Sequence, residues 1–240
     1  MTDDPAAPAP HAHHLRVERT ARYYTLGADD ADVRAIWFVL HGYGQLAGSF
    51  VRFFADIAKL GALVVAPEAL NRFYLVSPES APARERPVGA TWMTREDRES
   101  EVSDYVEYLD ALSDEIIGER QIAERQLQIN ALGFSQGAAT ATRWVLNGRP
   151  RFERLVLWGG LMPPDVDLAR GMVRLRDTRV TLVAGTRDHY ISEDILAAER
   201  ARIEAAGITC ESIRFDGGHV ISRSVFPRLL GAAISDVSDR

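Results

Sequence analysis

The sequence predicts an α/β fold, with a mostly parallel central sheet covered by helices on both faces. Two features of the chain predict it: short continuous apolar runs recur, as strands buried on both faces require, and segments with helical spacing separate them. Alternating strands and helices give right-handed crossovers and place ligand chemistry at the carboxyl ends of the strands. The 240 residues contain no internal linker, so a single domain over residues 15–240 is expected.

The first ordered element is expected at residues 15–26. Arg, Val, Thr and Tyr alternate there in part, as in a half-exposed antiparallel strand or hairpin at a sheet edge. Six apolar runs follow as inner strands, which are expected at residues 35–42, 62–67, 127–134, 154–160, 179–185 and 210–215. Helical spacing predicts helices at residues 48–60, 97–117, 136–146, 192–206 and 222–237.

Two segments fall outside this pattern. Residues 1–14 are rich in proline and lack the apolar run of a secretory signal, which indicates a disordered arm. The arm carries His11, His13 and His14, which are interpreted as solvated side chains rather than as metal ligands. Residues 70–95 are irregular and proline-rich but contain aromatic side chains, which is typical of a long loop that shapes a pocket.

The composition restricts the partners and the compartment. A net charge of −6 and a pI near 5.6 disfavour binding to nucleic acid, which usually needs a clustered positive surface. With 46% hydrophobic and 26% charged residues, the chain has the composition of a globular protein, and no membrane span is expected. Cys210 is the one cysteine, which excludes an internal disulfide and a cysteine-rich zinc site and favours a reducing, cytoplasmic location.

The sequence GFSQG at residues 133–137 matches the pattern G-x-S-x-G between a predicted strand and a predicted helix. In this context the serine occupies a sharp, strained turn, and the two glycines prevent collisions with neighbouring backbone. The turn holds the hydroxyl out over the sheet edge, so Ser135 is the predicted nucleophile. The alternative is that Ser135 is simply the N-cap of the following helix.

A serine hydroxyl needs a neighbouring base to take its proton. His41, His189 and His219 lie inside the folded part of the chain. His219 follows the last predicted strand through a flexible Asp-Gly-Gly turn, and Asp188 follows the preceding strand, which gives the chain order serine, acid, base. We therefore predict His219 as the base and Asp188 as the acid that orients it, with a plain turn and a helix N-cap as the competing interpretations.

The remaining histidines and acids near these strands are weaker candidates. His189 directly follows Asp188 and is expected to point away from it. Asp216 and Glu211 share or adjoin the last strand, so the chain would have to fold back to present either of them as the acid.

The oxyanion of a tetrahedral intermediate requires two hydrogen-bond donors. One is expected to be the backbone N–H of Gln136, which follows the nucleophile. The second is expected from the turn His41-Gly42-Tyr43-Gly44 after the first inner strand, with Tyr43 best placed to offer its N–H. His41 itself is expected to bind loop backbone, as a lone histidine at a strand end commonly does.

The motifs LHGYG and GFSQG, the Asp188 loop and the GGH turn at His219 resemble those of the phospholipase/carboxylesterase branch of the α/β-hydrolases. That branch includes small bacterial carboxylesterases and acyl-protein thioesterases. The resemblance implies an α/β-hydrolase fold without a large cap domain, and an enzyme that needs no cofactor and no metal. It also implies that small-molecule carboxylic esters with short to medium acyl chains are cleaved through an acyl-enzyme at Ser135.

The pocket that would hold the acyl chain is expected near two apolar segments. The pair Trp92–Met93 resembles an aromatic segment that lines the pocket in this branch, although packing of the loop by Trp92 explains it equally well. Leu161 and Met162 follow a Trp-Gly-Gly turn and are expected on the opposite wall. The predicted pocket residues are Phe73, Trp92, Met93, Leu161 and Met162.

Other functions stay open at this point. A thioesterase, a lysophospholipase or an acyltransferase would use the same triad, and a binding protein on the same scaffold would have lost the activity. A dinucleotide-binding oxidoreductase is the remote alternative, because Gly42, Gly44 and Gly48 follow a strand and Glu68 lies near the end of the next strand. The substrate is open between an ester and a thioester, and the oligomeric state is open to a homodimer.

Overall fold

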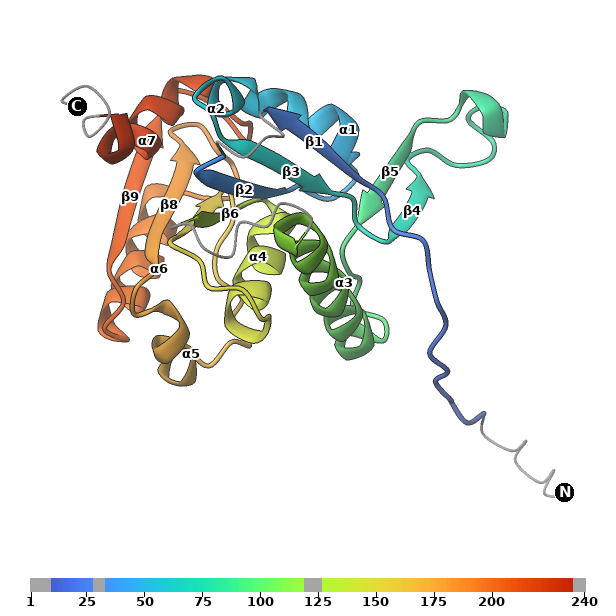
Figure 1. Cartoon of the computed structure of the whole chain (residues 1–240). Coiled ribbons are helices and arrows are strands. Elements are labelled where there is room, and N and C mark those ends of the chain that lie inside the picture. The colour runs from blue at the N-terminus through green and yellow to red at the C-terminus, as the bar shows by residue number, and fades with distance from the viewer. Residues whose placement is uncertain (1–9, 28–32, 119–126, 235–240) are drawn as a thin grey trace, which may run out of the picture.

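The computed structural model describes residues 10–27, 33–118 and 127–234, and side chains as far as residue 230 (Figure 1). The predicted disordered arm therefore lies mostly outside the described residues. Its last part, residues 10–14, is exposed and has no regular secondary structure. The last residues of the C-terminal helix predicted at 222–237 also lie outside the described part.

The centre of the fold is a seven-stranded sheet in the order β1-β3-β2-β6-β7-β8-β9. The edge strand β1 is antiparallel to β3, and all other neighbouring strands are parallel. All six predicted inner strands are present, which confirms the predicted fold class. The strands are β1 (Tyr23–Gly27), β2 (Ala35–Leu40), β3 (Leu63–Pro67), β6 (Gln128–Phe134), β7 (Arg154–Trp158), β8 (Arg179–Gly185) and β9 (Cys210–Phe215).

The predicted edge strand is shorter than expected. Residues 15–22 form no strand and are almost entirely exposed. Arg16 makes a two-pronged contact with Glu107, with N···O distances of 2.6 and 2.7 Å, and Arg19 donates to Asn71 over 3.1 Å. Because these arginines bind side chains rather than a neighbouring strand, the partial alternation of the segment overstated its strand character.

Helices cover both faces of the sheet, with α1, α2 and α7 on one side and α3, α4, α5 and α6 on the other (Figure 1). The helix predicted at residues 48–60 is broken by a turn of 3₁₀ helix, and α5 was not predicted, because it is short and has a glycine at its centre. The helices are α1 (Ala47–Phe50), η1 (Val51–Phe54), α2 (Ala55–Lys59), α3 (Arg98–Gly118), α4 (Gln136–Asn147), α5 (Leu168–Leu175), α6 (Glu193–Ala205), η4 (Arg223–Val225) and α7 (Phe226–Ile234).

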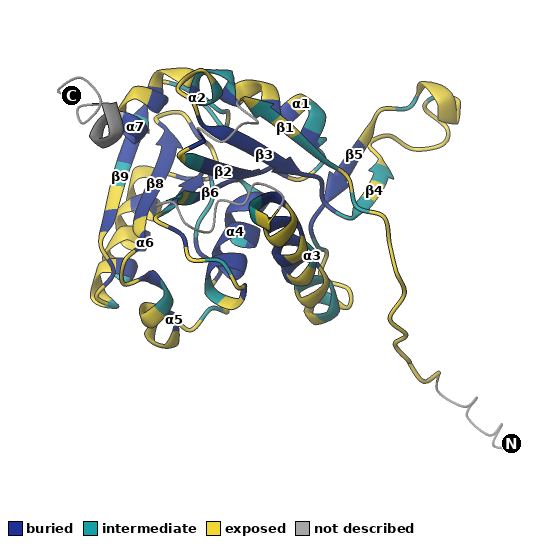
Figure 2. Cartoon of the chain, in the orientation of Figure 1, coloured by how far each residue is buried: buried dark blue, intermediate teal, exposed yellow. Residues whose placement is uncertain are grey.

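The sheet separates two apolar cores, and its strands are buried on both faces (Figure 2). Alternate residues of β2 enter different cores: Phe38 packs with α3 and α4, whereas Trp37 packs with α1 and α7. This two-sided burial explains why the inner strands appear as continuous apolar runs in the sequence. No helix in the described residues is long and apolar enough to cross a membrane.

The irregular segment at residues 70–95 contains a hairpin that was not predicted. Its strands are β4 (Asn71–Tyr74) and β5 (Val88–Thr91), and a 3₁₀ turn, η2 (Ala83–Glu85), lies near its tip. The hairpin projects from the end of the sheet (Figure 1). Its base is joined to the loop after β2, since the N–H of Gly44 donates to the carbonyl of Ala90 over 2.9 Å.

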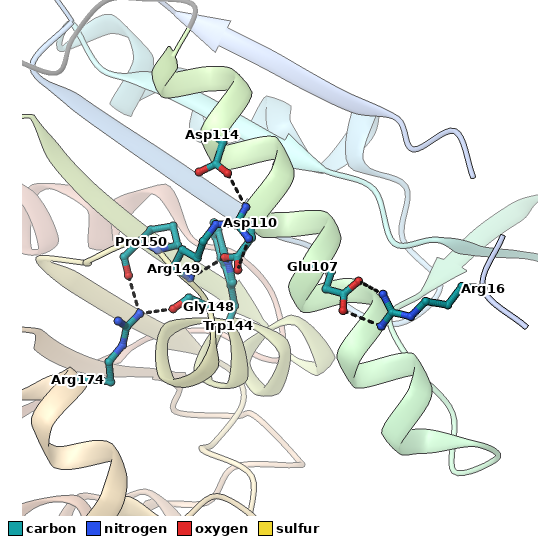
Figure 3. A network of polar contacts seen from close by, with 9 residues as sticks. All are labelled: Arg16, Glu107, Asp110, Asp114, Trp144, Gly148, Arg149, Pro150 and Arg174. Carbon is teal, nitrogen blue, oxygen red and sulfur yellow. Dashed lines mark hydrogen bonds and ion pairs between the residues drawn. The ribbon is translucent and has the colours of Figure 1, made fainter. Parts of the chain in front are cut away.

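A polar network anchors the far end of α4, the helix that follows the predicted nucleophile (Figure 3). The buried carboxylate of Asp110 accepts the indole N–H of Trp144 at 2.9 Å and the backbone N–H of Arg149 at 2.8 Å. From α5, the guanidinium of Arg174 donates to the carbonyls of Gly148 and Pro150. Carbonyls at the end of a helix lack intrahelical partners, and Arg174 supplies a donor to the carbonyl of Gly148. Together with the bonds to Asp110, this contact holds the end of α4 against α3 and α5.

Candidate active site

Ser135 lies in a sharp turn between β6 and α4. Its backbone has φ 54° and ψ −117°, a region that residues with a side chain rarely occupy. A Cβ on Gly133 would lie 2.1 Å from the carbonyl oxygen of Gly137, and one on Gly137 would lie 2.2 Å from that of Leu40. Both glycines are therefore required by close backbone approach, as the G-x-S-x-G pattern predicts. The Ser135 side chain makes no capping bond to α4, which argues against a role as a helix N-cap.

Asp188 and His219 meet at the same edge of the sheet, after β8 and β9. Nδ1 of His219 lies 2.8 Å from Oδ2 of Asp188. The second carboxylate oxygen accepts the backbone N–H groups of Tyr190 at 2.9 Å and Ile191 at 3.3 Å. The carboxylate is thus held on one side by backbone donors and presents its other oxygen to the imidazole, which favours a proton on Nδ1 and leaves Nε2 available as a base.

The imidazole of His219 packs beside the serine turn. Its ring centroid lies 4.9 Å from that of Phe134, the residue before Ser135. Gly159 follows β7 and has φ 58°. It lies close to the ring, since a Cβ there would be 2.9 Å from Cε1 and 3.0 Å from Nδ1 of His219. The three residues predicted from sequence as nucleophile, acid and base are therefore brought to one end of the sheet, on loops after three different strands.

The loop after β2 reaches the serine because Leu40 pairs with Gly133 in the sheet register. A Cβ on Gly42 would lie 3.2 Å from Cβ of Ser135, so the backbone before Tyr43 is in contact with the serine. Gln136 is the first residue of α4, where a backbone N–H has no acceptor within the helix. The two N–H groups predicted as oxyanion donors thus belong to the residue that follows Ser135 and to the residue that follows Gly42, which lies against Ser135.

His41 is completely buried below this loop. Its Nδ1 lies 2.8 Å from the carbonyl oxygen of Gly42, and its Nε2 accepts the N–H of Ala69 at 3.1 Å. Burial lowers the pKa of His41, against the smaller opposing effects of the bond to Gly42 and the charge of Glu68. The side chain is a neutral bridge between loop backbones, which is the role expected from the sequence.

The five residues predicted to line a pocket separate into two groups. Trp92 and Met162 are 2% exposed and belong to the core, and the indole N–H of Trp92 donates to the carbonyl of His41 over 2.8 Å. Met93 and Leu161 are half-buried at the core surface. Phe73, on β4, is also half-buried. Of the five, these last three keep surface that a substrate could contact.

Two aromatic side chains that the pocket prediction did not include flank the candidate catalytic groups. Tyr43 and Tyr190 are each 62% exposed. The ring of Tyr43 lies 5.1 Å from that of Phe73, and the ring of Tyr190 meets His219 edge-on at 4.8 Å. His189 is exposed, with its ring 6.3 Å from that of His219. Exposed aromatic side chains therefore lie beside the candidate catalytic groups.

Asp216, the rival acid, binds elsewhere. It forms an ion pair with Arg187, and both side chains are exposed. Arg187 precedes Asp188, and its backbone N–H also donates to the carbonyl of Gly217 over 2.8 Å. The pair connects the loop of the predicted acid to the loop of the predicted base.

Gln136 has a second set of contacts that its predicted role did not include. Its side-chain Nε2 donates to the carbonyl of Met93 at 2.8 Å, and its Oε1 accepts the N–H of Trp92 at 3.1 Å and the hydroxyl of Thr91 at 3.2 Å. The amide ties the end of β5 to the serine turn. Nothing in the local sequence indicated this link, because its partners lie more than 40 positions away along the chain.

A buried arginine lies two turns along α4 from the serine. Arg143, 3% exposed, contacts Asp165 through Nη2 at 2.8 Å, and Arg98 contacts the other oxygen of Asp165 at 2.8 Å. Burial would raise the pKa of Asp165, but hydrogen bonds from Arg143 and Arg98 lower it to about 2. This ionised cluster joins the segment after β7 to α3 and α4, and Nη1 of Arg143 lies 3.6 Å from the sulfur of Met93.

The glycine pattern that suggested a dinucleotide site has another explanation. Glu68 is fully buried, and its Oε1 accepts Arg22 and Arg72 at 2.6 Å each. Burial opposes ionisation, but these two arginines lower the pKa of Glu68. Gly48 lies in α1 and packs against the ring of Tyr24, which belongs to β1. Glu68 is thus committed to an internal ion pair. The described residues also contain no group of three or more His, Cys, Asp or Glu side chains that could hold a metal ion.

Comparison with known protein families identifies the family to which the chain belongs. A family model described as Phospholipase/Carboxylesterase matches residues 27–229, most of the sequence. The chain belongs to the phospholipase/carboxylesterase family. Membership confirms the resemblance found in the motifs, makes the chain a serine hydrolase of the carboxylesterase type, and excludes the dinucleotide-binding alternative.

Solved structures of esterases share the fold of this family member at low sequence identity. A carboxylesterase from Mesorhizobium loti is 20% identical, with a TM-score of 0.64 over 88% of this chain and 94% of that one. Acyl-protein thioesterase 2 from Zea mays is 15% identical, with a TM-score of 0.62 over 90% and 99%. The Bacillus cereus carboxylesterase is 16% identical, with a TM-score of 0.59 over 90% and 94%. No curated protein matches the sequence.

Proposed function

We propose that this hydrolase cleaves carboxylic esters through an acyl-enzyme at Ser135, with His219 as the base and Asp188 as the acid that orients it. The observation that carries the proposal is the 2.8 Å contact between His219 and Asp188 at the sheet edge where Ser135 occupies its strained turn. Family membership supports the same chemistry.

The proposed reaction begins when the hydroxyl of Ser135 attacks the ester carbonyl and passes its proton to Nε2 of His219. The N–H groups of Tyr43 and Gln136 stabilise the negative oxygen of the tetrahedral intermediate. The intermediate collapses, the imidazolium gives its proton to the leaving alkoxide, and the acyl group remains on Ser135. Water, deprotonated by His219, then attacks the acyl-enzyme and releases the carboxylic acid.

The substrate class we propose is an ester with a short to medium acyl chain. Met93 and Leu161 offer half-buried apolar surface, whereas Trp92 and Met162 are already packed in the core. The surface left for an acyl chain is therefore smaller than the five predicted residues suggested. Tyr43 and Tyr190 are exposed beside the proposed catalytic groups and are available to contact the leaving group or the end of the acyl chain.

The deciding experiment is hydrolysis of p-nitrophenyl esters from acetate to palmitate by the wild type and by Ser135→Ala. We expect the hydrolysis rate to be highest for short or medium acyl chains. Ser135→Ala should lose at least about 1000-fold in kcat, and the small activity that remains should come from the oxyanion hole. Ser49→Ala, at an exposed serine of α1, is the matched control and should keep full activity. Retention of most of the activity by Ser135→Ala would refute the mechanism.

Labelling by a fluorophosphonate probe, combined with the ester assay, separates the proposed esterase from other enzymes with the same triad and from an inactive binding protein. The probe labels a serine quickly when a base activates it, and intact-mass analysis shows whether Ser135 is the site. Labelling at Ser135 without hydrolysis of any ester would point to a thioesterase, a lysophospholipase or an acyltransferase. Absence of both labelling and hydrolysis would point to a binding protein that has lost the activity.

A further inference from the structure

The loop after β2 leaves one of its backbone donors unused. The N–H of Gly42 donates to Oε1 of Gln45 at 2.8 Å, that of Gly44 to the carbonyl of Ala90 at 2.9 Å, and that of Gln45 to the carbonyl of Gly42 at 3.2 Å. The N–H of Tyr43 has no acceptor within the described part of the chain. Tyr43 is exposed and follows Gly42, which lies against Ser135, so its unpaired N–H is available for an oxyanion beside the serine.

The direction of the Tyr43 N–H is set by bonds to the two peptide groups around Gly42. The Tyr43 N–H and the Gly42 carbonyl belong to one planar trans peptide and point in opposite directions. His41 Nδ1, at 2.8 Å, and the backbone N–H of Gln45, at 3.2 Å, hold that carbonyl. The preceding peptide is held through the His41 carbonyl by Trp92 and through the Gly42 N–H by the Gln45 side chain.

Gln45 therefore bonds both peptides, the first through its side chain and the second through its own N–H. Its side-chain oxygen lies close to the reaction centre: a Cβ on Gly42 would be 3.2 Å from Oε1 of Gln45 and 3.2 Å from Cβ of Ser135. The side-chain bond also occupies the Gly42 N–H. Without it, this donor would be free to turn toward solvent or toward the oxyanion, and the turn would lose the constraint that aims Tyr43.

We infer that the side-chain amide of Gln45 is a positioning group for the oxyanion hole, which fixes the backbone of Gly42 so that the Tyr43 N–H faces the tetrahedral intermediate. The inference rests on the proposed function. Gln45 does not touch substrate; it acts through the Tyr43 N–H. Its contribution should therefore appear in the transition state and be absent from ground-state binding.

The test replaces Gln45 with methionine, which has a similar length but lacks the acceptor. We expect kcat to fall by about 10- to 100-fold, with KM within about threefold of wild type, since a misaligned oxyanion donor affects only the transition state. The affinity for an alkyl boronic acid, which forms a tetrahedral adduct with the serine, should fall by a similar factor. Gln45→Glu keeps an acceptor oxygen in the same place and should preserve the bond to the Gly42 N–H, but its negative charge lies near the developing oxyanion. Its kcat should therefore fall between that of Gln45→Met and that of the wild type.

The matched control is Gln128→Met, at an exposed glutamine where β6 begins, at the opposite end of the sheet. It should leave kcat and boronic acid affinity unchanged. If Gln45→Met is too unstable to assay, Gln45→Ala removes the same acceptor and must meet the same expectation. A merely structural role for Gln45 would lower the melting temperature without a selective loss of boronic acid affinity, and that result would overturn the inference.

The outcomes also separate this inference from the proposed function. If the wild type neither hydrolyses esters nor reacts with the fluorophosphonate probe, the proposed function and the role of Gln45 are both refuted. If ester hydrolysis depends on Ser135 but Gln45→Met keeps the full kcat, only the role of Gln45 is refuted.

Discussion

Oδ2 of Asp188 lies 2.8 Å from Nδ1 of His219, and its other carboxylate oxygen is held by the backbone N–H groups of Tyr190 and Ile191. Asp188→Asn should therefore keep the loop in place through its amide oxygen but present its amide nitrogen, a hydrogen-bond donor, to Nδ1 of the imidazole. We expect kcat to fall by at least about 1000-fold, because the imidazolium loses its counter-charge and its tautomer is no longer fixed. Steady-state ester hydrolysis measures the effect.

The matched control for this change is Asp216→Asn, at the exposed carboxylate three residues before His219. Loss of its surface ion pair with Arg187 should alter kcat by no more than a few fold. The reverse pattern, with Asp216→Asn inactive and Asp188→Asn active, would transfer the role of the acid to Asp216.

Gly159 supports the imidazole of His219 from the side. It has φ 58°, and a Cβ there would lie 2.9 Å from Cε1 and 3.0 Å from Nδ1 of the ring. Gly159→Ala should displace the ring from its contact with Asp188. We expect a loss of about 100-fold in kcat, since small misplacements of a catalytic group have effects of that order, and a destabilisation of about 1–2 kcal/mol from the left-handed backbone.

Gly61→Ala separates these two effects. Gly61 also has a positive φ, 84°, but a Cβ there would meet nothing within 4 Å. This variant should lose about 1 kcal/mol of stability and keep its activity. Equal kcat values for Gly159→Ala and Gly61→Ala would show that the contact with His219 has no catalytic consequence.

The strain at Ser135 should be measurable as stability. Its φ of 54° and ψ of −117° are readily accessible to glycine but not to alanine or serine. Ser135→Gly should therefore be more stable than Ser135→Ala by about 1 kcal/mol, a rise of about 2–4 °C in melting temperature for a chain of this size. In the helical residue Ser49, the same comparison should have the opposite sign, because glycine destabilises a helix relative to alanine.

The sequence was sufficient to predict the sheet and the residues at its carboxyl edge, for a physical reason. Strands buried on both faces leave continuous apolar runs, and parallel strands bring their carboxyl ends together. Once β6, β8 and β9 were located, Ser135, Asp188 and His219 were expected at the same edge of the sheet. Their proximity in the structure follows from the strand order β6-β7-β8-β9.

The hairpin of β4 and β5 could not be predicted in the same way. Each strand has four residues, and neither has a long apolar run. The hairpin is located by contacts distant in sequence, such as the approach of Gly89 to Gly44, where a Cβ would lie 2.4 Å from the carbonyl oxygen. Trp92 was expected at a pocket because Trp92–Met93 resembles a pocket-lining segment of this branch, with packing of the loop as the alternative. Its indole N–H instead finds a buried acceptor in the carbonyl of His41, 51 positions away, which allows nearly complete burial.

His41 gives the protein a pH-dependent stability whose sign follows from its burial. Burial lowers the pKa of His41 below its ordinary value of 6.5, although the bond to the Gly42 carbonyl and the charge of Glu68 oppose this. In the unfolded chain the imidazole takes up a proton near pH 6.5, whereas in the folded chain it stays neutral to lower pH. The stability is therefore complete above pH 6.5 and declines as the pH falls below it, by at most about 1.4 kcal/mol per pH unit for this group.

Urea unfolding of the wild type and of His41→Gln at pH 7.5 and pH 5.5 tests this sign. His41→Gln should be the less stable protein at pH 7.5, because a glutamine cannot reproduce both the contact with Gly42 and that with Ala69. It should then lose less stability than the wild type on going to pH 5.5, since it has no imidazole to protonate on unfolding. His13→Gln, on the exposed N-terminal segment, should keep the full pH dependence of the wild type. An unchanged pH dependence in His41→Gln would mean that His41 is protonated equally in both states, and that its burial has no energetic consequence in this range.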